Sequence, residues 1–117
     1  MSLNQLNEQQ KELFLDICIY AVMVDKEFAK EEKELIEQYC MEMQLPEIRF
    51  TAMTDFEEAV DRLLAISSRE ELQLIAREVA QLIMSDQHFD EFERQFSEQF
   101  VDKIGMSREA FAALLER

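Results

Sequence analysis

Only one glycine and one proline occur among the 117 residues of this chain. Hairpin turns and barrel corners depend on these two residue types, so the chain has little material for connecting the strands of a β-sheet. Residues with high helix propensity, chiefly Glu, Gln, Leu, Ala and Met, are abundant instead. The sequence therefore predicts an all-α fold, and its length fits one domain over residues 1–117.

Helical periodicity divides the chain into six to seven helices, which should pack as a compact bundle. Asn7 with Gln10 is a capping pair for a first helix. A second helix is predicted over residues 30–44, and it should end before Pro46 because the residue preceding a proline avoids the helical region. Residues 47–53 fit either a short helical turn or a loop.

Capping signals also mark the later helices. Three capping boxes run from Thr54 to Glu57, from Ser68 to Glu71 and from Asp90 to Glu93. The single glycine, Gly105, stands where a left-handed residue would end a helix, and Ser107 should cap a last short helix. These local signals predict where each helix from the third onward begins, and where the fifth helix ends.

Apolar stripes on these helices indicate the core. Phe89, Phe92, Phe96 and Phe100 lie at helical spacing and are expected to be packed. Most of the seven methionines, among them Met23, Met43 and Met84, fall on such stripes and are also expected to be packed.

The stretches MVDKEFAKEE, from Met23, and MSDQHFDEFE, from Met84, repeat one pattern at an offset of 61 residues. In each, an Asp is followed three residues later by Phe and seven residues later by Glu. We expect two repeated helical hairpins, over about residues 8–45 and about 69–105. Neither hairpin can bury its apolar stripe alone, so the two should pack together about a pseudo-twofold axis.

The chain is strongly acidic, with 26 acidic and 12 basic side chains and a net charge of −14. Such a field repels phosphate backbones and anionic lipid, which disfavours nucleic-acid binding and membrane-surface binding. No apolar segment approaches membrane-spanning length and no signal-peptide pattern is found, so we expect no membrane insertion and a cytoplasmic location. Cys18 and Cys40 are expected to be reduced and buried as small hydrophobic residues.

The repeated pattern resembles the tellurite-resistance TerB family, including the TerB-like module of a DnaJ-like membrane co-chaperone. Asp25, Phe28 and Glu32 match the family's recurring motif once, and Asp86, Phe89 and Glu93 match it again. The resemblance covers roughly residues 8–115 and implies an all-helical TerB-like domain. Lys26 and Gln87 replace the family's glycine after the Asp, and Ala29 stands where a capping side chain is usual.

The resemblance also implies an acidic metal site in the two Asp-to-Glu loops. Oxygen ligands suit Ca²⁺ or Mg²⁺, and a histidine among them would suit a transition metal. The candidate metal-binding residues are Asp25, Glu32, Asp86, His88, Asp90 and Glu93. A purely architectural role is the competing interpretation, because a carboxylate at the third position of a helix stabilises the cap and the helix dipole.

No catalytic constellation can be assembled from this sequence. One histidine, no Gly-rich phosphate loop and no zinc-type Cys/His spacing leave no nucleophile with its base and no cofactor site, so we expect no enzymatic activity. The expected function is an acidic adaptor that binds a basic or amphipathic protein surface, with a homodimer left open and a stress-related role implied by the resemblance alone. The alternative is a metal-binding or metal-sensing domain.

Overall fold

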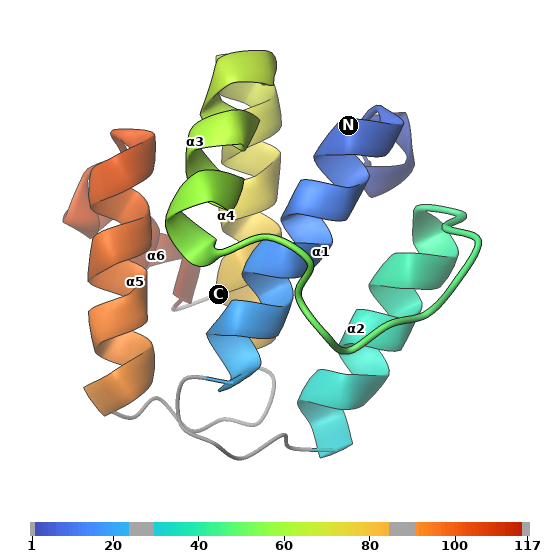
Figure 1. Cartoon of the computed structure of the whole chain (residues 1–117). Coiled ribbons are helices and arrows are strands. Elements are labelled where there is room, and N and C mark those ends of the chain that lie inside the picture. The colour runs from blue at the N-terminus through green and yellow to red at the C-terminus, as the bar shows by residue number, and fades with distance from the viewer. Residues whose placement is uncertain (1, 24–29, 85–90, 116–117) are drawn as a thin grey trace.

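The chain folds as a bundle of helices in a computed structural model that describes residues 2–23, 30–84 and 91–115 (Figure 1). A short 3-10 helix, η1 (Leu3–Gln5), precedes the first α-helix. The α-helices of these ranges are α1 (Glu8–Met23), α2 (Lys30–Glu42), α3 (Phe56–Ile66), α4 (Arg69–Ile83), α5 (Glu91–Ile104) and α6 (Arg108–Leu115). The prediction of an all-α fold is confirmed.

Helix α1 lies at the centre of the bundle. It contacts α2, α3, α4 and α5, and residues 13–19 are buried without interruption. A helix that is apolar on every side has to be covered on every side, which explains why four helices surround this one. Helices α1 and α4 are in contact, and Figure 1 shows α3 in front of α4, with α2 and α5 on opposite flanks of the bundle. Phe56 of α3 joins this core through Tyr20 and Phe96, whose ring centroids lie 6.1 and 5.1 Å from its own.

The capping boxes predicted for α1 and α4 are confirmed. Asn7 and Gln10 exchange two backbone-to-side-chain hydrogen bonds of 2.8 and 2.9 Å, and Ser68 and Glu71 exchange two of 3.1 and 2.7 Å. The buried Gln10 amide also donates to the hydroxyl of Ser67 at 3.0 Å. The first turn of α1 is therefore joined to the α3–α4 connection at one end of the bundle.

Helices α2 and α5 end in the same way. Gln44 has φ 57° and Gly105 has φ 77°, and both belong to the left-handed region. Just beyond them, Leu45 donates its N–H to the carbonyl of residue 40, and Met106 donates to that of residue 101, each at 3.1 Å. In each case an N–H bonds to the carbonyl five residues earlier, and this satisfies a carbonyl that the helix end would otherwise leave unpaired. Gly105 confirms its predicted role, whereas Gln44 adopts the same backbone conformation with a side chain.

The two pairs of helices keep a constant spacing along the chain. Helices α1 and α4 begin at residues 8 and 69, and α2 and α5 begin at residues 30 and 91, so both offsets are 61 residues. The left-handed residues 44 and 105 have the same offset. Positions that are 61 residues apart are called equivalent below.

Some local predictions were wrong or fall outside the described residues. The N-cap of α3 is Asp55, which accepts the N–H of Glu58 at 2.9 Å, and not Thr54. The prediction that the methionines are packed is confirmed for Met43, which is buried, and wrong for Met23, which is exposed. The predicted cap Asp90 and the motif residues Phe28 and Phe89 lie outside the described residues.

Both cysteines are buried free thiols, as expected. Burial raises the pKa of the Cys18 thiol well above its ordinary value, and it also raises that of Cys40. Across the described ranges, none of the helices combines the length and the apolar composition that crossing a bilayer requires.

Candidate functional site

Two of the predicted metal-binding residues, Glu32 and Glu93, are described by the structure. They are the third residues of α2 and α5, they are equivalent in position, and each is 1% exposed. The other four, Asp25, Asp86, His88 and Asp90, lie outside the described residues. Within the described ranges, no group of three or more His, Cys, Asp or Glu side chains could hold a metal ion.

The burial of Glu32 and Glu93 has a physical consequence. Transferring a carboxylate out of water is costly unless hydrogen bonds or a cation compensate for the lost hydration. The first turn of a helix supplies N–H groups and the positive end of its dipole, and both helices offer this environment. The positions fit the capping interpretation, and they also place two buried acids beside the two Asp-to-Glu loops.

A different site is formed by the connection between α2 and α3. Residues 43–55 contain no helix, and a connection of this length without regular structure is uncommon in a small domain. Arg49 fixes this segment to α1: it donates to Asp16 Oδ1 at 2.6 Å and to Glu12 Oε2 at 2.8 Å. It also donates to the carbonyl of Thr51 within the segment at 2.7 Å. Asp16 Oδ1 additionally accepts the N–H of Met53 at 3.1 Å.

This ion pair is largely removed from water. The side chain of Asp16 is 3% exposed and that of Arg49 is 18% exposed. Burial opposes the charge of Arg49, but the carboxylates of Glu12 and Asp16 outweigh it, so the pKa of the guanidinium is raised. A buried acid that lost this cation would be left with a large desolvation cost. The network therefore holds residues 49–53 in one conformation.

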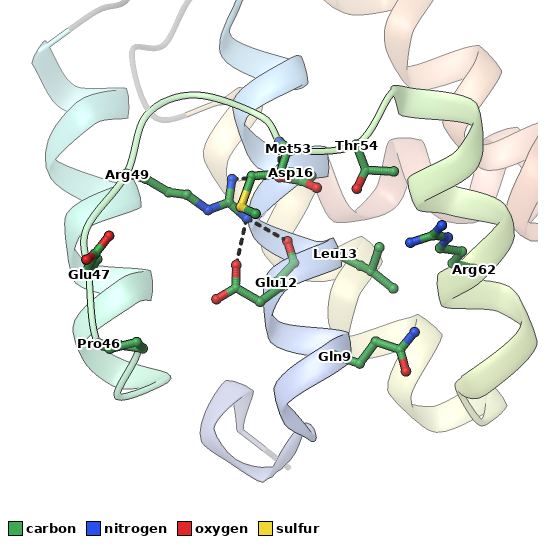
Figure 2. A pocket seen from close by; sticks show the side chains of 10 residues that line it. All are labelled: Gln9, Glu12, Leu13, Asp16, Pro46, Glu47, Arg49, Met53, Thr54 and Arg62. Atoms are coloured by element: carbon green, nitrogen blue, oxygen red, sulfur yellow. Dashed lines mark hydrogen bonds and ion pairs between the residues drawn. The ribbon is translucent and has the colours of Figure 1, made fainter.

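A pocket opens beside this network, between α1, the α2–α3 connection and α3 (Figure 2). Its volume is about 310 Å³. We call it the Arg49 pocket, and it is lined by Gln9, Glu12, Leu13, Asp16, Pro46, Glu47, Arg49, Met53, Thr54 and Arg62. Figure 2 shows Arg49 and Arg62 on opposite sides of the pocket. Each guanidinium is already engaged, since Arg62 pairs with Glu58 at 2.5 Å.

Large apolar side chains are exposed in the connection that lines the Arg49 pocket and at the end of α2 just before it. Met41, Ile48 and Met53 are 71%, 50% and 76% exposed, and they are three of the four exposed large apolar residues in the described part of the chain. All three fall within residues 41–53, at the end of α2 and in the segment that follows it. Scattered surface hydrophobics are ordinary, but three within residues 41–53 make this segment a candidate contact surface.

Sequence reasoning missed this site. One signal was present: Asp16 interrupts the apolar run LFLDICIYAV of α1, and a buried acid requires a partner. The partner, Arg49, lies 33 residues further along the chain. Local patterns act over only a few residues, so they could not identify it.

Comparisons with protein-family models, with curated proteins and with solved structures found no match for this chain. The chemistry of the site therefore rests on the described residues themselves. The lining of the Arg49 pocket combines carboxylates, paired guanidiniums and apolar side chains, and its only hydroxyl group is that of Thr54. Neither a histidine nor a cysteine belongs to this lining.

Proposed function

We propose that this protein is a non-enzymatic, acidic interaction module that binds a basic or amphipathic protein surface. The exposed apolar segment around the Arg49 pocket is the observation that carries the proposal. Apolar side chains supply the contact area, and the net charge of −14 attracts and orients a basic partner. Because Arg49 holds the segment in place, little conformational entropy is lost when a partner binds.

The proposal extends to the architecture. We propose that the chain is a duplicated helical hairpin of the TerB-like type, with a stress-related role as that resemblance implies. The constant offset of 61 residues between the two helix pairs, their capping boxes and their left-handed ends supports the duplication. The resemblance itself supports the TerB-like type.

Binding can be tested with a defined probe. The probe is a helical peptide of about four turns, or about 14 residues, with leucines on one face and lysines on the other. Isothermal titration calorimetry on the whole protein should show binding that weakens as salt is raised from about 50 to about 500 mM, because salt screens exposed charges. A peptide with glutamates in place of the lysines is the control. Equal binding of both peptides, or binding of neither, would refute the proposed function.

Divalent-cation binding is a second candidate function. The observation that favours it is the burial of two equivalent carboxylates, Glu32 and Glu93, beside the two loops that contain Asp25 and Asp86. A cation bound in a loop would offset part of the desolvation cost of these two carboxylates.

The cation and capping interpretations predict different results in a thermal-shift assay. If a loop binds metal, Ca²⁺, Mg²⁺, Mn²⁺ or Zn²⁺ should raise the melting temperature relative to a chelator. Asp86→Ala combined with Glu93→Ala should abolish that rise. If Glu93 acts only as a cap, Glu93→Ala should destabilise by about 0.5–2 kcal/mol with or without metal. No shift with any ion at millimolar concentration would exclude the cation function.

A further inference from the structure

A second pocket occupies the equivalent place in the other half of the chain. It lies between α4 and α6, has a volume of about 340 Å³, and is called the Ala110 pocket. Six of its lining positions lie 61 residues after lining positions of the Arg49 pocket: 9 and 70, 12 and 73, 13 and 74, 16 and 77, 49 and 110, and 53 and 114. Two pockets that share six positions and nearly the same volume are a property of the repeated framework and not an accident of one surface.

Charge distinguishes the two pockets. Three carboxylates and two guanidiniums line the Arg49 pocket, whereas one of each, Glu70 and Arg77, lines the Ala110 pocket. The key difference is at equivalent positions 16 and 77, where Asp16 is matched by Arg77. Asp16 is neutralised by Arg49, but the only ion pair of Arg77 among the described residues joins its Nε to Glu78 at 3.8 Å. At this position the Ala110 pocket therefore carries an exposed cation, whereas the Arg49 pocket carries a buried acid.

Apolar exposure also distinguishes them. Met53 projects into solvent beside the Arg49 pocket, whereas its equivalent, Leu114, is half-buried. Exposed Ile48 lies next to Glu47 and Arg49 of the same lining. On α4 and on residues 108–114 of α6, no large apolar side chain is exposed.

We propose that the Arg49 pocket is the docking site for one amphipathic helix that carries lysine or arginine, and that the Ala110 pocket rejects this ligand. The inference rests on the proposed function and assigns its site and its ligand. Apolar residues of the helix contact Met53 and Leu13, and its cations pair with Glu47 and Glu12. A helix in a groove uses this combination of apolar anchors and a charged rim.

The two acids are available for such pairing. Glu47 is exposed, and the half-exposed Glu12 uses Oε2 for Arg49. Arg49 and Arg62 do not repel a cationic helix strongly, because Asp16, Glu12 and Glu58 already compensate them. In the Ala110 pocket the guanidinium of Arg77 faces an approaching cation at the position where Asp16 lies in the other pocket, which costs binding energy through like-charge repulsion.

The test maps where the leucine–lysine peptide binds. In amide nuclear magnetic resonance spectra of the labelled protein, titration should shift the signals of residues around Leu13, Met53 and Arg62 and leave those around Leu74, Ala110 and Leu114 in place. Shifts centred on the Ala110 pocket, or equal shifts at both pockets, would overturn the inference.

Two matched variants give an independent measurement. Met53→Lys and Ala110→Lys each place a cation on an exposed position of one pocket, so neither is expected to unfold the protein. Met53→Lys should weaken peptide binding at least about tenfold, whereas Ala110→Lys should change it less than about twofold. Equal effects would overturn the site assignment. If neither variant loses peptide binding, the site assignment is overturned and the proposed function stands. If the wild-type protein does not bind the peptide, the site assignment and the proposed function are both refuted.

Discussion

The Arg49 network should be one of the largest single contributors to the stability of this protein, and replacing Arg49 by methionine tests this directly. Methionine keeps much of the length and the apolar stem but removes four donated hydrogen bonds: to Asp16, to Thr51, and to the side chain and carbonyl of Glu12. Asp16 would then be a buried carboxylate that accepts only the N–H of Met53 among the bonds described above.

The expected magnitude follows from the burial of the pair. Removing one partner of a buried ion pair costs about 3–5 kcal/mol, and the partial exposure of Arg49 places the expected loss near the lower limit, about 3 kcal/mol. For a chain of 117 residues this corresponds to a fall in the melting temperature of about 10 °C. Urea denaturation followed by circular dichroism measures the loss in the free energy of unfolding.

An exposed ion pair in the same protein supplies the control. Arg108 and Asp102 lie 3.0 Å apart with both side chains more than half-exposed, so Arg108→Met should cost less than about 1 kcal/mol. Adding Asp16→Asn to Arg49→Met should recover part of the loss, because the uncompensated buried charge is then removed. If Arg49→Met costs no more than Arg108→Met, the reasoning about burial is wrong.

Three further predictions concern helix ends and buried groups. Gln44→Gly should stabilise the protein by about 0.5–1 kcal/mol and Gly105→Ala should destabilise it by about 1 kcal/mol, because both backbone positions are left-handed. Thermal denaturation measures both changes. A destabilised Gln44→Gly variant would contradict this explanation. The pKa of Glu71 is lowered by its hydrogen bond from the backbone of the preceding cap, so its charged form adds stability above the unfolded pKa of about 4.5, and that stability is lost as the pH falls through the folded pKa. Glu71→Gln should therefore lower stability at neutral pH and have no such effect in acid, and a difference from wild type that is independent of pH would count against this role. Cys18 and Cys40 are buried with raised pKa values, so neither thiol should react with Ellman's reagent until denaturant unfolds the chain, and rapid reaction of the native protein would show that the core is open.

The sequence alone was sufficient for the features that depend on neighbouring residues. The all-α class follows from the shortage of glycine and proline, and the caps at Asn7 and Ser68 and the helix end at Gly105 follow from interactions that reach only a few residues along the chain. The start of α3 was misplaced by one residue because Thr54 and Asp55 are both good caps, and only the observed hydrogen bond to Glu58 distinguishes them.

The conformation of residues 47–54 was decided by tertiary structure. Their equivalents, residues 108–115, form α6, in which Ser107 accepts the N–H of Ala110 at 3.0 Å. In the first half Pro46 stands at the equivalent of Ser107 and has no capping side chain, and Arg49 is drawn to Asp16 instead of continuing a helix. That ion pair joins residues 33 positions apart, so it exists only once the helices are packed. The Arg49 pocket and the exposed segment around it are consequences of this long-range contact, which local patterns in a single sequence do not encode.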